Sequence, residues 1–441
     1  MDSRNKALDA IRGYAIVTMV FSGSIAYGGV LPAFMYHAQS PPPKHEWVEN
    51  LPGITWVDLV FPLFLFAMGA AIPMSMQKGM DWKKQLKRFA LLVFFAIFFE
   101  HSKYTNFSQL DSALTYLIAL TGFLSLFLIM GTKKILYQCI GFGIALLLVL
   151  FAPFDNKGHF ELHRSDVIIL VLANMALIGA AIYHYTRVHH VYRLLLLVPL
   201  YGLITGRFLD ESWNQYIYEP YFADWLIEFN FLKYLFMVIP GIYAGEWLLK
   251  KTDWNKGATR SISKIGLAWL CIGLVAWNII ALYNRWLMMN LFISLAAMLL
   301  ILVWQIRFNK QNQLDQRLLL AGCYLLICGL FFEAFEGGIK KDDATLSYMF
   351  VTGGMAFFLL FAFDQFSLLT KALAPVGQNP LLAYALPGIF LLPLIDLTGL
   401  GPWYDGLDQT AFQGILHGLV IVLPTALLAA LATKYRIFWK S

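Results

Sequence analysis

Long runs of apolar residues, separated by short polar segments, dominate the chain. An apolar run of about 20 residues can cross the hydrocarbon core of a bilayer as a helix. The pattern predicts fourteen such helices, at residues 8–28, 54–76, 88–106, 111–130, 135–153, 167–184, 192–208, 231–249, 264–283, 286–304, 318–336, 346–363, 380–399 and 412–433. Some boundaries are weakly marked, so we expect roughly 11 to 14 spans. The predicted fold is an all-α, polytopic integral membrane helical bundle, with residues 1–441 forming a single domain.

The composition leads to the same fold class. Of the 441 residues, 59% are hydrophobic and 14% are charged, and the mean hydropathy is +0.63. A water-soluble domain carries about 25% charged residues, so a soluble globule is excluded and the lipid bilayer is the expected environment. The net charge of +6 does not indicate a nucleic-acid partner, because the basic residues lie mostly in short loops, where they set topology. Their distribution predicts that both termini are cytoplasmic.

The sequence does not predict a metal site or a disulfide framework. All four cysteines lie inside apolar runs and none shows a Cys-x-x-Cys spacing. His159 and His163 stand four residues apart, but no third ligand is evident near them. We therefore expect no metal cofactor.

Ionisable side chains inside predicted spans are costly unless they are paired or face a cavity, so they are functional candidates. Asp9 and Arg12 are three residues apart at the start of the first span, where they can form an ion pair or help to hold an anionic ligand. Glu333 and Asp396 lie at the ends of later spans and are candidate sugar or proton contacts.

The segment between the first two predicted spans carries the strongest candidate chemistry. It contains His37 and His45, and Asp58 follows at the start of the second span. A histidine near neutral pH can accept a proton when a carboxylate fixes its tautomer, and Asp58 is placed to do so for His37. The alternative is structural, because Thr55 and Asp58 have the spacing of a capping box.

Two later segments have distinctive backbone signals. The run GQNPLLAYALPGIF places Asn379 before a proline, so Asn379 can cap a helix or face a ligand, and Pro387 interrupts that helix partway. The run FMVIPGIYAGEWLLK places Gly241 and Gly245 four apart, which predicts close packing against another helix.

Three segments together resemble the heparan-alpha-glucosaminide N-acetyltransferase family and its bacterial NagX-type relatives. They are LDAIRGYAIVTMVF, MYHA and GITWVDLVFPLFLFAMGAAIPMSM, with IPGIYAGEWLL and GQNPLLAY as weaker later matches. The resemblance implies a multi-pass enzyme of the bacterial inner membrane that moves an acetyl or acyl group from cytoplasmic acetyl-CoA to an amino sugar or glycan on the other side. It implies His37 as the catalytic histidine, with Asp58 as its acidic neighbour and His45 as the competing candidate. Ser22 and Ser24 stand where the family has an asparagine, and they become candidate substrate contacts.

Because acetyl-CoA cannot cross hydrocarbon, this reaction needs a tunnel with basic residues at its inner mouth. Arg12, Lys84 and Arg88, with Asp9 beside Arg12, are the candidate cofactor-binding residues, while Glu333, Asn379 and Asp396 remain candidate substrate contacts. Two alternatives stay open: a transporter of N-acetylglucosamine or a similar sugar, as NagX-type relatives suggest, and a scaffold without chemistry. A homodimer is also compatible with the sequence.

Overall fold

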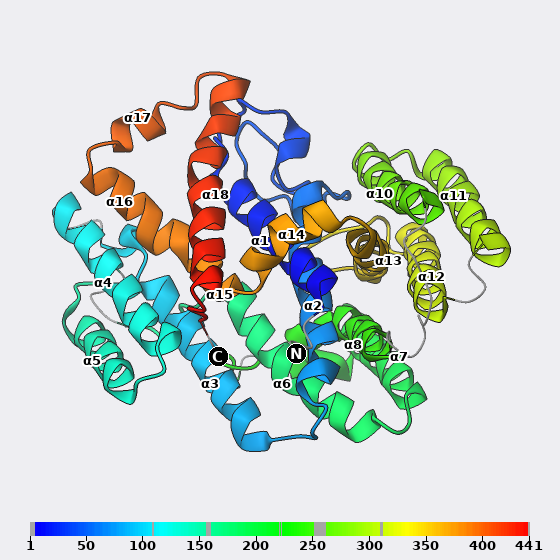
Figure 1. The fold of residues 1–441 in the computed structure, drawn as a ribbon, viewed down its shortest axis with the longest axis horizontal. Coiled ribbons are helices and arrows are strands. Elements are labelled where there is room, and N and C mark those ends of the chain that lie inside the picture. Colours follow the sequence, from blue (N-terminus) through cyan, green and yellow to red (C-terminus); the bar gives the residue numbers. More distant parts are fainter. Residues whose placement is uncertain are drawn as a thin grey trace.

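The computed structural model of the chain describes residues 5–107, 110–155, 160–219, 221, 223–250, 262–308 and 312–439. Over these ranges it is an all-α bundle without strands (Figure 1). The long helices of the first half are α1 (Lys6–Ser24), α2 (Val60–Ser75), α3 (Trp82–His101), α4 (Ser112–Gly131), α5 (Ile135–Phe151), α6 (Val167–Thr186), α7 (Val191–Gly206) and α8 (Leu235–Leu249). Those of the second half are α10 (Ile262–Tyr283), α11 (Leu287–Phe308), α12 (Gln313–Phe335), α13 (Leu346–Gln365), α14 (Ser367–Gly377), α15 (Pro380–Leu386), α16 (Leu392–Leu397), α17 (Gly401–Asp405) and α18 (Ala411–Lys434).

Each of the fourteen predicted spans coincides with a helix, or with the α15–α16 pair in the case of 380–399. In the described ranges, ten helical segments are long and apolar enough to cross a membrane, and α5 and α7 are shorter apolar helices. The chain is therefore a polytopic membrane protein, as predicted. Helix α14 was not predicted as a separate element. It packs across the first turns of α1, where Gly377 meets the backbone of Asp9 and Gly13. His159 lies outside the described residues.

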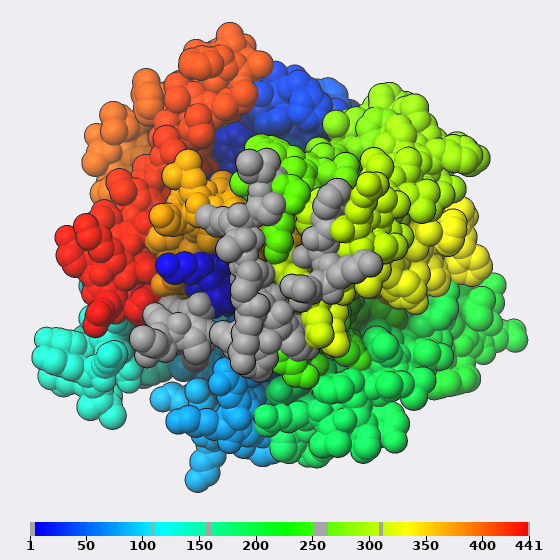
Figure 2. All heavy atoms as spheres, turned by 45° about the vertical axis from the view of Figure 1, so that its right-hand side comes forward, coloured from blue at the N-terminus to red at the C-terminus, as the bar shows by residue number. Residues whose placement is uncertain are grey.

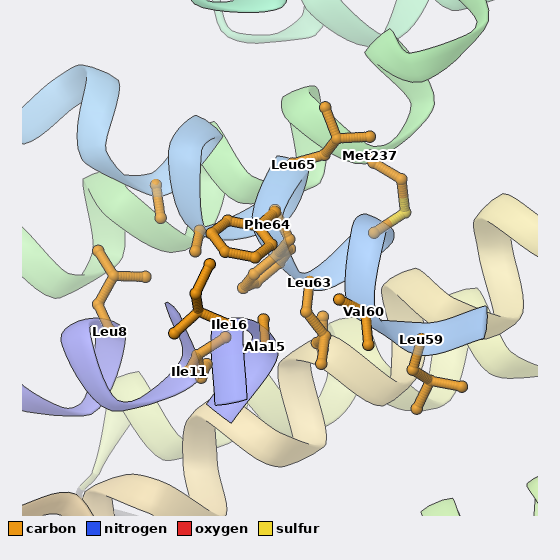
Figure 3. Close-up of a cluster of buried hydrophobic side chains, with 14 of the residues drawn as sticks. Leu8, Ile11, Ala15, Ile16, Leu59, Val60, Leu63, Phe64, Leu65 and Met237 are labelled. Atoms are coloured by element: carbon orange, nitrogen blue, oxygen red, sulfur yellow. The ribbon is translucent and has the colours of Figure 1, made fainter. Parts of the chain in front are cut away.

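The core of the bundle is built around α1, α2 and α13. Side chains of α13 are buried along almost its whole length. Figure 3 shows Ile11, Ala15 and Ile16 of α1 facing Leu63 and Phe64 of α2. On the other side of α2, Gly241 and Gly245 bring α8 against the backbone of α2, and a Cβ atom at either glycine would collide with that backbone. The predicted close packing at these two glycines is confirmed.

Two helix pairs lie at the periphery. The α4–α5 pair and the α10–α11 pair occupy opposite edges of the molecule (Figures 1 and 2). Helix α5 buries only Gly141 and Ala145, while leucines and phenylalanines cover the rest of its surface. Such surfaces suit contact with lipid chains rather than water.

The predicted interruption at Pro387 is also observed. A π-helical turn at Pro387–Leu391 separates α15 from α16, because a proline cannot donate to the helical ladder. Asn379 corrects the sequence reasoning, since its side chain does not cap α15. Instead its amide donates to the Ile437 carbonyl (2.8 Å) and accepts from the Trp439 amide (3.0 Å). These contacts and the α1–α14 packing place both terminal segments at one end of the bundle. We call this the terminal end, and the opposite end, with residues 25–55, the loop end.

Candidate active site

The loop end holds a histidine–carboxylate pair. His37 Nδ1 lies 2.6 Å from Asp58 Oδ1. Because a carboxylate only accepts hydrogen bonds, Nδ1 carries the proton and Nε2 is left as an acceptor. The His37 side chain is 31% exposed, whereas that of Asp58 is 2% exposed. The pair therefore has a buried orienting group and a base that ligands can reach.

The second carboxylate oxygen of Asp58 is held by the turn that precedes α2. It accepts hydrogen bonds from the backbone amides of Thr55 (2.8 Å) and Ala38 (3.4 Å), and Thr55 and Asp58 form a capping box. Tyr348 on α13 donates to the Asp58 carbonyl (2.6 Å). The two interpretations of Asp58 are thus compatible, because one oxygen caps the turn while the other orients His37.

Lys341, from the loop between α12 and α13, completes this cluster. Its ammonium nitrogen lies 3.3 Å from both ring nitrogens of His37 and 5.7 Å from the centre of the Trp47 ring. Burial lowers the pKa of the Lys341 ammonium below its ordinary value, although the Asp58 and Asp342 carboxylates act in the opposite direction. Sequence reasoning missed Lys341. The available signal was a Lys340–Lys341 pair in a loop predicted to be external, against the usual charge bias.

Gln39 joins the two loops that form this cluster. Its amide donates to the carbonyls of Glu49 (2.7 Å) and Asp342 (2.8 Å), and its side-chain oxygen accepts from the Asp342 amide (3.2 Å). The side chain of Gln39 is buried. The position of Lys341 over His37 is therefore fixed by contacts on both loops.

His45, the competing candidate, braces the first loop. Its Nε2 accepts from the Gly28 amide (3.1 Å), and its ring packs against those of Tyr27 (4.9 Å between centres) and Tyr36 (4.4 Å). With Nε2 engaged by the backbone, His45 has no acceptor nitrogen to offer a ligand.

A central cavity of about 410 Å³ opens among α1, α2, α3, α6 and α15. Arg12, Lys84 and Arg88 line it toward the terminal end, and apolar residues such as Met19 and Phe64 line it toward the loop end. Three of the four predicted cofactor-binding residues thus share one cavity. The fourth, Asp9, forms the expected ion pair with Arg12 (3.3 Å).

The central cavity and the His37 cluster are separate in this structure. On α2 the lining runs from Ser75 to Phe64, a rise of about 16 Å, and Phe64 is a further ~9 Å along the helix from Asp58. Neither His37 nor Asp58 lines the cavity. The described residues thus form a cavity with basic residues toward the terminal end, and its lining ends before the His37 cluster.

The two serines of α1 lie in its last turn, at the loop end. Ser22 is one turn beyond Met19, and its hydroxyl donates back to the Met19 carbonyl (2.8 Å). Ser24 is buried, and its carbonyl accepts from His417 Nδ1 (2.5 Å). The rings of Phe21 and Trp56 contact each other here, with centres 5.9 Å apart. Neither Ser22 nor Ser24 lines the central cavity, and neither hydrogen bond brings its side chain to His37.

The other predicted substrate contacts lie elsewhere. Glu333 is buried and pairs with Arg285 (2.5 Å), Asn379 holds the C-terminal segment, and Asp396 is half-buried on α16. None of the three lines the central cavity or bonds to His37. A residue that the sequence did not suggest does line the cavity: Tyr384, whose hydroxyl donates to Asp166 Oδ2 (2.5 Å).

The chain matches the family model described as "Domain of unknown function (DUF5009)" over residues 4–248, more than half of its length. The protein belongs to this family. A comparison with curated proteins found no match. The DUF5009 region contains His37, Asp58 and the three basic residues of the central cavity, whereas Lys341 comes from the part of the chain beyond it.

Proposed function

We propose that this DUF5009 protein is a multi-pass membrane acyltransferase. It takes an acetyl or short acyl group from acyl-CoA at the terminal end, which we assign to the cytoplasm, and transfers it to an amino sugar or glycan at the loop end. The observation that carries the proposal is the His37–Asp58 pair, an oriented base in the segment that joins α1 to α2. The same two helices line a cavity that has basic residues toward the terminal end. The resemblance of the α1–α2 segments to heparan-alpha-glucosaminide N-acetyltransferases supports it.

The central cavity suits the donor chemically. Arg12, Lys84 and Arg88 offer positive charge for CoA phosphates at one end, where the phosphates can stay near water. The apolar walls formed by α1, α2 and α6 suit an uncharged pantetheine and acyl chain. The thioester then points along α2 toward Asp58 and His37.

His37 supplies the proton transfer. The lone pair of the acceptor amine attacks the thioester carbonyl carbon, and His37 Nε2 takes the proton that the nitrogen loses. The carbon–sulfur bond breaks, and CoA leaves as a thiolate that is then protonated. In the alternative course, Nε2 itself attacks the thioester carbonyl carbon, the carbon–sulfur bond breaks and CoA leaves as a thiolate. The acceptor amine then attacks the acyl-histidine, the bond from the acyl carbon to Nε2 breaks, and the freed Nε2 takes the proton that the amine loses. Asp58 stabilises the charged imidazole in both courses.

The proposal requires side chains between the cavity and His37 to move. Met19 and Phe64 end the lining, and the Phe21–Trp56 contact lies beyond them. Phe64 lines the cavity at the end of α2 nearer to His37, so a change of its side-chain rotamer would alter the cavity at that end. Ligand-driven closure and opening of this kind is common in enzymes.

The test is an acetyl-transfer assay on the purified full-length protein in proteoliposomes, with radiolabelled acetyl-CoA and glucosamine. Product and released CoA thiol are both measured. We expect His37→Ala to lower turnover by roughly 10²- to 10⁴-fold, and the exposed His184→Ala to leave it unchanged. A single turnover without acceptor, followed by mass spectrometry of the His37 peptide, separates the two courses.

Two results would overturn the proposal. One is equal turnover of the His37→Ala variant and the unmodified protein. The other is uptake of unmodified N-acetylglucosamine into vesicles that contain no CoA, with no acetyl transfer under any condition. That second result would identify a transporter instead.

A further inference from the structure

A second cavity of about 760 Å³ lies beside the central one, between α3, α4, α5 and the segment after α18. Among the residues that the structure describes, five basic ones and no acidic one line it: Lys84, Lys87, Arg88, Lys133 and Arg436. Within the described parts of the chain, none of the five forms an ion pair with a carboxylate. We call this space the basic cavity.

Its lining changes character along α3. One face of α3 lines the cavity, because the lining residues follow each other at intervals of about three or four positions. They include Lys84, Lys87 with its neighbour Arg88, Leu91 and Phe94. The first two turns of that face are cationic and the next two are apolar.

Apolar walls continue on the neighbouring helices. Ile129 and Met130 of α4 and Phe142 of α5 also line the space. Helix α5 is a peripheral helix with few buried side chains, so this side of the cavity is next to the region where lipid chains run (Figure 1). The basic cavity is therefore amphipathic in the same direction as a phospholipid.

We propose that the basic cavity binds an anionic glycerophospholipid, with its phosphate among the five cations and an acyl chain along Leu91, Phe94 and Phe142. Clusters of lysine and arginine at headgroup depth attract anionic lipids, and each basic residue contributes to the binding. A free phosphate would satisfy the cations alone and would leave the apolar wall unused. The proposal does not depend on acyl transfer.

The proposed headgroup site shares two residues with the central cavity. Lys84 and Arg88 line both spaces, so a phosphate between them on the α4 side holds the same two side chains that face the central cavity. Lipid composition would thus set the positions of these two side chains.

The test measures binding of phosphatidylglycerol and phosphatidylcholine to the delipidated full-length protein by native mass spectrometry. The test variant is Lys87→Gln/Lys133→Gln/Arg436→Gln, which spares the residues shared with the central cavity. The control variant is Lys83→Gln/Lys134→Gln/Lys434→Gln, which removes the same charge from exposed neighbours that do not line the basic cavity. We expect phosphatidylglycerol to bind the test variant about 100-fold more weakly and the control with little change.

A substitution in the apolar wall distinguishes the two possible sources of the phosphate, a lipid headgroup and free inorganic phosphate. Phe142→Ser is expected to weaken phosphatidylglycerol binding and to leave inorganic phosphate binding unchanged. If phosphatidylglycerol binding falls equally in the test and control variants, the overall positive charge of the terminal end attracts the lipid and no specific site exists, which would overturn the proposal. So would displacement of phosphatidylglycerol by inorganic phosphate or by adenosine 3′,5′-bisphosphate at equal concentration, which would identify a site for soluble phosphates.

Discussion

The Lys341 ammonium lies 3.3 Å from His37 Nε2, the nitrogen that the contact with Asp58 leaves as an acceptor. An ammonium donates hydrogen bonds and cannot accept them, so it occupies the position that an amine of the acceptor would take. A bound acceptor amine must therefore displace Lys341 or share the nitrogen with it. This makes the α12–α13 loop part of the site.

The stability of the folded protein should depend on pH through Lys341. Its folded-state pKa lies below the ordinary value of 10.5 because of burial. Between these two values the unfolded chain binds more protons than the folded one, so stability rises with pH in that window. We expect thermal unfolding in detergent to show this rise for the unmodified protein, and a smaller rise for Lys341→Met. Identical pH slopes for the two proteins would contradict the assignment.

Activity and stability should separate at Asp58. Asp58→Asn removes the charge that orients and stabilises the His37 ring, and we expect acetyl transfer to fall by about 10²-fold or more. Thr55→Val removes a hydroxyl that donates to Tyr36 O (2.7 Å) and to Asp58 Oδ2 (3.2 Å), but it leaves the His37 contact intact.

Thr55→Val should lower the unfolding temperature by an amount equivalent to about 0.5–2 kcal/mol for the lost hydroxyl. The amide oxygen that Asp58→Asn introduces can still accept the hydrogen bond of the Thr55 backbone amide, so this substitution should cost less stability. Only Asp58→Asn should lower turnover in the fraction that remains folded. Equal turnover losses would mean that Asp58 serves the capping box alone.

Filling the central cavity should block the donor. Ala71 lines that cavity on α2, and a tryptophan there would occupy the space assigned to pantetheine. We expect Ala71→Trp to weaken acyl-CoA binding by roughly 10- to 100-fold, which is the effect of an overpacking cost of a few kcal/mol. The control is Ala296→Trp, on an exposed face of α11. Unchanged acyl-CoA binding in Ala71→Trp, measured by equilibrium titration, would place the donor elsewhere.

The buried ion pair between α7 and α8 should contribute to stability without affecting the reaction. Arg193 is fully buried and lies 2.8 Å from Glu246, with Tyr183 and Tyr243 rings against its guanidinium. Glu246→Ala leaves this guanidinium without its counter-charge, and we expect a cost of about 3–5 kcal/mol. The double variant Arg193→Met/Glu246→Ala should recover much of it. Denaturant or thermal unfolding measures both, and a double variant that is less stable than Glu246→Ala would refute the account.

Local sequence information was sufficient for the helices. A membrane-spanning helix needs about 20 apolar residues regardless of the helices around it, because its backbone groups must form their hydrogen bonds within the helix. This is why all fourteen predicted spans are helical. Helix α14 was not predicted, because it is too short and too amphipathic to form an apolar span and instead lies across α1. The Pro387 interruption and the close packing at Gly241 and Gly245 were also predicted, since each depends on the properties of a single residue type.

Contacts between distant segments were decided by the tertiary structure. His37 and Asp58 flank one loop, 21 residues apart, so their pairing could be anticipated. Lys341 is 304 residues from His37, and no local pattern connects the two. For Asn379 the sequence predicts either a helix cap or a ligand contact, because it could not show that the C-terminal segment returns to this side chain. Hydropathy fixes each span separately, whereas packing between helices determines which polar side chains share a site.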